Sequence, residues 1–364
     1  MPKNLSKRCI LITILFLLVA VTTCFAHRPQ DPAHQTYSVG DLTLENGQVI
    51  KDFSISFVTH GTLNQDKSNA ILMTSSYIGN HHRVDFLIGP GKALDTDKYF
   101  IICTDAIGNG LTTSPSTSKT QHGMAFPRFS LRDMVASQHK LVTEHFGIKH
   151  LVAVTGASMG GMQSLQWGVS HPGFMDNIIA LTPAARCPAW TAGVLDVVVK
   201  AMMLDPAWNN GAYTDNPEQA ARLRTDITLS LTASTPDAVK EAFRDNPKDF
   251  LKAMKTLANA QLAFDVNDSI YQAWAIIDFS IGDTPGYGGD YYKALQGIKA
   301  KTILLTAPLD ILVPVDEAME AARYIPGAVY IQIPSVQGHF AATTKVAADV
   351  KFMNEKIGEF LKKY

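Results

Sequence analysis

The sequence predicts an α/β fold, in which a mostly parallel β-sheet is covered by helices on both faces. Short runs rich in β-branched and aromatic residues alternate with helical stretches, at residues 52–58, 70–74, 99–103, 151–155, 178–182, 302–306 and 329–333. This alternation is typical of parallel strands joined by helices. The early runs follow one another more closely, which indicates an antiparallel edge.

The first 26 residues have the order of a secretory signal peptide. Lys3, Lys7 and Arg8 precede an apolar run from Cys9 to Val21, and small residues lead to a cut near Ala26. An N-terminal membrane anchor is the alternative, but a run of 13 residues is shorter than the roughly 20 that span a bilayer. Lipidation of Cys24 is a further alternative. We expect a periplasmic or secreted protein with no stable membrane span after cleavage.

Composition excludes several classes of protein. The chain has 364 residues, of which 46% are hydrophobic, so it can bury a large core and does not resemble a disordered or fibrous protein. Cleavage near Ala26 removes three cations and no acids, which moves the net charge from −1 to −4. Without a basic patch, nucleic acid is not an expected partner. Cys103 and Cys187 are expected to be buried free thiols.

The expected elements divide the chain into four parts. A helix is expected between Ser130 and His145, with Ser130 and Asp133 spaced as a capping pair. Strand-forming runs are missing from residue 183 to about residue 299, where the sequence is helical and rich in Ala, Met and Trp. We therefore expect a signal peptide at 1–26, a core at 27–182, an inserted helical cap at 183–299 and the rest of the core at 300–364.

Ser158 lies in a sequence that is typical of a reactive serine. Gly156-Ala-Ser-Met-Gly160 follows the strand expected at 151–155 and precedes a helix that begins near Gly161. A glycine-rich turn alone is weak evidence, but a strand, a sharp turn and a helix together form a nucleophile elbow. Side chains at 156 or 160 would collide with the neighbouring strand or helix.

A serine nucleophile needs a histidine base and an acid that orients this base. Asp310 follows the strand expected at 302–306, and His339 follows the strand expected at 329–333. Both loops therefore lie at carboxyl ends of strands, where open α/β sheets place their sites. Taken singly, Asp310 could be a residue that merely caps a turn, and His339 could be a surface or packed histidine. All three in the order Ser, acid, His favour a catalytic triad.

The oxyanion of such a reaction needs backbone N–H donors. We expect the amide of Met159, directly after the serine, and the amide of Tyr77, in the loop after the strand at 70–74. His81 and His82 could suggest a metal site, but the sequence has no third ligand at a useful spacing, so neither a metal nor a cofactor is expected.

The chain resembles the homoserine O-acetyltransferase family of α/β-hydrolases along nearly all of its mature length. The matching segments are His60-Gly-Thr-Leu-Asn64, Ile88-Gly-Pro-Gly-Lys-Ala-Leu-Asp-Thr96, Arg132-Asp-Met134, Gly156 to Gln163, Ala185-Arg186, Asp205-Pro-Ala-Trp208 and Gly338-His339. The resemblance implies the α/β-hydrolase fold, with an eight-stranded, mostly parallel sheet flanked by helices. It also implies a helical cap, the triad of Ser158, Asp310 and His339, and a homodimer joined through the cap.

The positions that bind homoserine in this family are only partly present. Arg222 matches the family's carboxylate-binding arginine, but Leu229 replaces an expected tyrosine and Phe340 replaces an expected acid. The family's Gly-Gly-Cys stretch reads Ile107-Gly-Asn-Gly110. Export also removes the protein from the supply of acetyl-CoA.

These observations favour an exported carboxylic ester hydrolase that acts on a small-molecule ester through an acyl-serine intermediate. A homoserine O-acetyltransferase-like acyltransferase is the first alternative. The second is a catalytically silent binding protein of the same fold, although silent relatives tend to lack a member of the triad.

Overall fold

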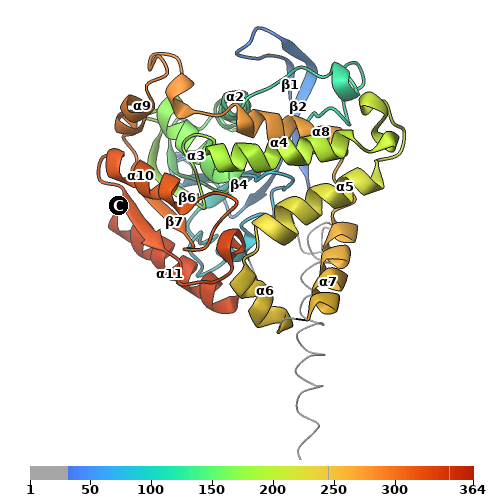
Figure 1. Cartoon of the computed structure of the whole chain (residues 1–364). Helices are drawn as coiled ribbons and strands as arrows, with labels where there is room; N and C mark the ends of the chain where they lie inside the picture. Colours follow the sequence, from blue (N-terminus) through green and yellow to red (C-terminus); the bar gives the residue numbers. More distant parts are fainter. Residues whose placement is uncertain (1–31, 245, 344) are drawn as a thin grey trace, which may run out of the picture.

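The computed structural model describes residues 32–364 except 245 and 344 (Figure 1). The expected signal peptide and Cys24 lie outside these residues. The strands are β1 (Gln35–Thr43), β2 (Val49–His60), β3 (Ala70–Thr74), β4 (Phe100–Thr104), β5 (Leu151–Ala157), β6 (Met175–Leu181), β7 (Lys301–Thr306) and β8 (Val329–Gln332).

The strands form one sheet in the order β1-β2-β4-β3-β5-β6-β7-β8. β2 is antiparallel to both β1 and β4, and the other neighbours are parallel. The predicted α/β class, the mostly parallel eight-stranded sheet and the antiparallel edge are therefore confirmed. β1 has no counterpart among the predicted runs, because most of its side chains are exposed at the sheet edge and its sequence carries little apolar pattern.

Helices join the strands and cover the sheet. The α-helices are α2 (Leu131–Lys140), α3 (Met159–Ser170), α4 (Ala189–Met203), α5 (Glu218–Thr225), α6 (Pro236–Phe243), α7 (Pro247–Ala260), α8 (Val266–Ile277), α9 (Tyr291–Gly297), α10 (Val315–Tyr324) and α11 (Ala347–Lys363). The shorter helical turns are η1 (Asp85–Leu87), η2 (Gly123–Ala125), η3 (Leu141–His145), η4 (Pro206–Gly211), η5 (Asp226–Thr232), η6 (Ile281–Asp283) and η7 (Gly338–Ala342).

The helix predicted between Ser130 and His145 is present as α2 followed by η3. Its predicted capping pair is confirmed, because the Asp133 amide donates to the Ser130 hydroxyl and the Ser130 amide donates to the Asp133 carboxylate. The buried carboxylate of Asp133 also accepts the Glu45 amide, which ties the helix start to the β1–β2 hairpin.

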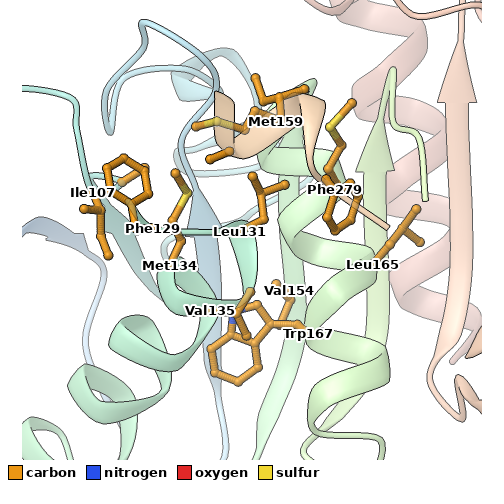
Figure 2. Close-up of a cluster of buried hydrophobic side chains, with 14 of the residues drawn as sticks. Ile107, Phe129, Leu131, Met134, Val135, Val154, Met159, Leu165, Trp167 and Phe279 are labelled. Carbon is orange, nitrogen blue, oxygen red and sulfur yellow. The ribbon is translucent and has the colours of Figure 1, made fainter. Parts of the chain in front are cut away.

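Alternating strand residues supply two cores, one on each face of the sheet. Leu72, Ile102 and Val154 belong to the core beneath α2, α3 and the cap, which Figure 2 shows around Trp167, Met159 and Leu165. Their sequence neighbours belong to the opposite core, together with α11; examples are Ile71, Met73, Ile101, Cys103 and Ala153. Because both faces are covered, the central strands consist almost entirely of apolar residues.

The segment between β6 and β7 carries α4 to α9. In Figure 1, α6 and α7 lie at its outer end, while α4 and α8 lie nearer the sheet. Phe279, which follows α8, is buried in the core of Figure 2, so this segment packs directly on the sheet domain.

Cys103 and Cys187 are both free thiols, as predicted, although Cys187 is only half-buried. Burial raises the pKa of both thiols, that of Cys187 to about 12. Both therefore stay protonated and unreactive near neutral pH. Within the described part of the chain, no helix is sufficiently long and apolar to cross a bilayer.

Candidate active site

Ser158 lies between β5 and α3 in a strained backbone conformation, with φ of 59° and ψ of −123°. A non-glycine residue at positive φ costs about 1–3 kcal/mol and persists only where its surroundings enforce it. The turn is enforced by close packing. A Cβ at Gly156 would lie 2.4 Å from the Thr74 hydroxyl, and a Cβ at Gly160 would lie 2.4 Å from the Thr74 carbonyl oxygen. This geometry is that of a nucleophile elbow.

Asp310 and His339 meet across the ends of β7 and β8. The Nδ1 of His339 lies 2.7 Å from Oδ2 of Asp310, and both residues are buried. The other carboxylate oxygen, Oδ1, accepts the backbone amides of Leu312 at 3.0 Å and Val313 at 2.9 Å. These bonds fix the carboxylate so that it directs the imidazole Nε2 away from the acid.

The three predicted triad residues all lie at the carboxyl edge of the sheet. Ser158 follows β5, Asp310 follows β7 and His339 lies in η7 after β8. β5 to β8 are adjacent and parallel, so their carboxyl ends lie along one edge. The structure thus places a serine at a sharp turn on the same sheet edge as an imidazole that is bonded to its acid. These are the residue types that an acyl-transfer site requires.

The end of β3 is tied to the elbow, which places the Tyr77 loop beside α3. Gln163 donates from Nε2 to the carbonyl oxygens of Ser75 at 2.9 Å and Met159 at 3.2 Å, and Thr74 donates to the carbonyl of Gly160 at 2.8 Å. Met159 is the first residue of α3, where amides have no partner within the helix. The amides of Tyr77 and Met159 therefore come from neighbouring segments, as an oxyanion hole requires.

The Tyr77 loop is itself strained and is held by the segment that carries α8. Ile78 has φ of 44°, which is unfavourable for a β-branched residue. Its amide donates to Oε1 of Gln272 at 3.0 Å, while Nε2 of Gln272 donates to the Ile107 carbonyl at 3.1 Å. Gln272 is fully buried. Sequence reasoning missed it because only the folded chain brings α8 to this loop.

The same inserted segment also contacts the acid and histidine loops. The Thr191 hydroxyl donates to the Leu312 carbonyl at 2.7 Å, two residues after Asp310. The Thr235 hydroxyl donates to the Val336 carbonyl at 2.5 Å, and the Phe340 amide donates to the Ala233 carbonyl at 3.3 Å. Each loop that carries a triad or oxyanion residue is thus bonded either to the elbow or to this segment.

Arg222, the candidate for substrate binding, lies on α5 and is partly exposed. Its guanidinium donates to Asn259 and to Glu218. It lines a surface cavity with residues of η5 and α7, namely Asp226, Leu251, Met254, Lys255 and Ala258. None of these residues belongs to the triad or its loops.

Arg224, two residues later, is the arginine that the structure buries completely. It donates to the carbonyls of Phe264 and Gln261 and to the Ser269 hydroxyl, while its Nε has no hydrogen-bond partner among the described residues. Burial raises the pKa of Tyr77 to about 12, and the charge of Arg224 opposes that rise. The buried Arg224 guanidinium thus acts electrostatically on the side chain of Tyr77.

Leu229 and Phe340 are two residues at which this chain differs from the family pattern. Leu229 is half-buried in η5, and Phe340 is half-buried directly after His339. The Phe340 ring lies beneath the Lys345 ammonium, 3.4 Å from the ring centroid. An aromatic ring with a cation on its face therefore occupies the position of the family's carboxylate.

His81 and His82 do not lie in isolation. The structure brings the exposed His34 and the buried Asp105 to His81, so that one potential ligand atom from each of these three residues lies within 4.8 Å of the others. His34 and Asp105 come from other parts of the sequence, so the local spacing around His81 and His82 could not indicate this cluster.

Comparison with known proteins agrees with this geometry. Residues 70–344 match the α/β-hydrolase fold family. An ethyl acetate hydrolase of Pseudomonas veronii is 33% identical over 313 residues, which cover 83% of this chain and 88% of the relative. A homoserine O-acetyltransferase of Leptospira biflexa is 32% identical over 338 residues, 84% of this chain and 88% of the relative.

A solved structure extends the likeness to three dimensions. The acetylester hydrolase from Corynebacterium glutamicum superposes with a TM-score of 0.85 at 29% identity, covering 91% of this chain and 96% of that one. The family match and the two curated relatives cover most of the chain. The chain therefore belongs to the α/β-hydrolase family, in the group that includes homoserine O-acetyltransferases and acetyl-ester hydrolases.

Proposed function

We propose that this protein is an exported carboxylic ester hydrolase that acts through an acyl-serine intermediate. The observation that carries this proposal is the buried Asp310–His339 pair at 2.7 Å, on the sheet edge that also bears Ser158 in its strained turn. The ethyl acetate hydrolase and acetylester hydrolase relatives support a small ester as substrate. No cofactor is required, because the three side chains supply nucleophile, base and orienting acid.

The reaction begins when Ser158 Oγ attacks the ester carbonyl and His339 Nε2 takes the hydroxyl proton. The carbonyl oxygen becomes an oxyanion that accepts the amides of Met159 and Tyr77. As the tetrahedral intermediate collapses, His339 returns the proton to the departing alkoxide, and the alcohol leaves. A water molecule then attacks the acyl-serine with His339 as base, which releases the acid and restores the Ser158 hydroxyl.

The direct test is single-turnover hydrolysis of a short p-nitrophenyl ester by the purified protein and by Ser158→Ala. We expect the variant to lose at least about 10⁴-fold in rate, because no other group replaces the nucleophile. Ser170→Ala, at the other end of α3, is the matched control and should remain within about twofold of the unchanged protein. Equal hydrolysis by Ser158→Ala and the unchanged protein would refute Ser158 as the nucleophile. Absence of hydrolysis by the unchanged protein would support a silent binding protein.

An acyltransferase of the homoserine class is the second candidate, which the similarity to the Leptospira biflexa enzyme favours. The same assay with added homoserine or simple alcohols separates the two functions. Free acid as the sole acyl product supports hydrolysis, whereas capture of the acyl group by an added alcohol in preference to water supports transfer. The missing tyrosine and acid at Leu229 and Phe340 favour hydrolysis.

We also propose a homodimer joined through the cap, the segment that carries α4 to α9. Trp190 and Val197 on α4 and Leu204 at its C-cap are 59%, 54% and 81% exposed. They follow one another at seven-residue intervals, so they lie along one face of the helix. An exposed apolar stripe of this kind marks an association surface. Light scattering should give a dimer that Val197→Glu converts to a monomer. Leu111 is an exposed leucine outside the cap, so Leu111→Glu should leave the dimer intact.

Export remains a proposal that rests on the basic, apolar and small-residue order of the first 26 residues. Expression of the full chain in a Gram-negative host should place the protein in the periplasm or medium, with an N-terminus that begins near His27. A membrane-bound product that retains Lys3 would instead indicate an anchor, and a product that begins with a lipidated Cys24 would indicate lipidation.

A further inference from the structure

We propose that His34, His81 and Asp105 form a binding site for a divalent transition-metal ion, with Zn²⁺ as its first candidate. The three ligand atoms already lie within 4.8 Å of one another. Two imidazoles and one carboxylate are ligands that Zn²⁺ accepts, and three protein ligands leave one tetrahedral position for water. None of the three residues belongs to the proposed triad.

The buried half of the site has a spacing that an ion can bridge. The Nδ1 of His81 lies 3.0 Å and 3.2 Å from the two Asp105 oxygens. Two ligands on a tetrahedral Zn²⁺ are about 3.3 Å apart, given bonds of about 2.0–2.2 Å. The distance between His81 Nδ1 and an Asp105 oxygen therefore needs to increase by only a few tenths of an ångström for both to bind one ion.

His34 completes the site from a different part of the chain. It lies directly before β1, and its ring meets that of His81 edge-on, with 4.3 Å between the centroids. Its side chain is exposed, and one of its ring nitrogens already lies within 4.8 Å of the ligand atoms of His81 and Asp105. An ordinary His–Asp hydrogen bond requires only two residues, whereas this cluster brings a third ligand to the pair.

Asp105 is oriented as metal-binding carboxylates usually are. It is fully buried and accepts the Ser56 hydroxyl at 2.8 Å, the Asn109 side-chain amide at 3.0 Å and the His81 backbone amide at 3.0 Å. Its partner in the described ion pairs is the imidazole of His81. A doubly charged ion would offset the free-energy cost of burying the Asp105 carboxylate.

The expected role of the ion is structural. It would join the start of β1 to the loop that runs from Tyr77 to His82 and to the end of β4, and so restrain the strained segment at Ile78. Metal binding should raise the resistance of the protein to unfolding, because the ion binds the folded chain.

The test is calorimetric titration of Zn²⁺ into the chelator-treated protein, together with the absorption spectrum of the Co²⁺ form. We expect one ion per chain with a dissociation constant in the micromolar range or below, and intense visible bands typical of four-coordinate Co²⁺. His34→Ala should weaken Zn²⁺ binding at least tenfold and abolish these bands. Because His34 is exposed, this variant should keep the melting temperature of the metal-free protein.

The matched control is His150→Ala, since His150 and Asp176 form an exposed His–Asp pair at 2.8 Å. This variant should bind Zn²⁺ as the unchanged protein does. His81→Gln is a second variant within the site and should also lose the ion. Absence of saturable binding, equal affinity in His34→Ala, or loss of binding in His150→Ala would each overturn the proposal.

Discussion

Replacement of Asp310 by asparagine tests the proposed triad most sharply, because the structure fixes how the new amide must lie. Oδ1 of Asp310 accepts two backbone amides, and Oδ2 faces Nδ1 of His339. The asparagine oxygen will keep the place that faces the two donors, so its NH₂ group will face the imidazole. Nδ1 must then accept, the proton moves to Nε2, and Nε2 can no longer take the proton of Ser158.

The expected loss in kcat can be calculated from the cost of flipping the asparagine amide. The active tautomer is regained only if the asparagine amide flips, which leaves the amides of Leu312 and Val313 facing an NH₂ group. Each unsatisfied buried donor costs about 1–3 kcal/mol, so the flip costs about 2–6 kcal/mol. With 1.36 kcal/mol per tenfold change, kcat should fall between roughly 30-fold and 10⁴-fold. The upper value matches the effect of this substitution in a serine protease triad.

The assay is steady-state hydrolysis of p-nitrophenyl acetate at pH 7.5, with circular dichroism to establish that the variant is folded. Asp316→Asn, an exposed position in the first turn of α10, is the control and should retain kcat within about twofold. A folded Asp310→Asn variant that loses less than tenfold in kcat would refute the role of Asp310 as the orienting acid.

Three further predictions concern the elbow, the Tyr77 loop and acid stability. Gly160→Ala should destabilise the protein by about 1–3 kcal/mol or displace the elbow, because its Cβ would lie 2.4 Å from the Thr74 carbonyl oxygen. Both the free energy of unfolding in urea and kcat should therefore change. Gly173→Ala has open space at its Cβ and should change neither quantity. Gln272→Leu should lower kcat at least tenfold with little change in KM, because the amide of Ile78 loses its acceptor; an unchanged kcat would contradict this role. Burial lowers the pKa of His171, which stacks on His139 with 4.1 Å between the ring centroids, to about 4. The unfolded pKa is about 6.5, so its contribution to stability is complete above pH 6.5 and is lost as the pH falls towards 4. The loss should be about 1–2 kcal/mol for this partly exposed ring, and His171→Phe should reduce it in urea unfolding at pH 7 and pH 4.5.

Local patterns sufficed to predict most of the sheet and the order of Ser158, Asp310 and His339. The central strands β3, β4, β5 and β6 are buried along nearly their whole length and read as apolar runs. The glycines at 156 and 160 could be interpreted because the strand, turn and helix form a short local motif. The contacts that require these glycines come from Thr74 in β3, which is distant in sequence.

Features that depend on long-range contacts could not be predicted. Gln272 lies 194 residues from Ile78, and Asp105 lies 24 residues from His81. Nothing in the local sequence of α8 distinguishes Gln272 from a helix residue that faces its own neighbours. Similarly, the sequence could not show which of Arg222 and Arg224 is buried. Arg224 lies on the face of α5 that contacts Phe264, just before α8, whereas Arg222 pairs with Glu218 on α5 itself.

The segment that carries α4 to α9 is hydrogen-bonded to three loops that carry or adjoin candidate site residues. Gln272 holds the Tyr77 loop, Thr191 holds the acid loop and Thr235 holds the histidine loop. A movement of the cap would therefore change the positions of the oxyanion donor, the acid and the base together. Because precise placement of these groups contributes several orders of magnitude to rate, substitutions at cap contacts far from the substrate should alter kcat as well as KM. The balance between water and an alcohol as acyl acceptor can thus change through the cap without any change in the triad.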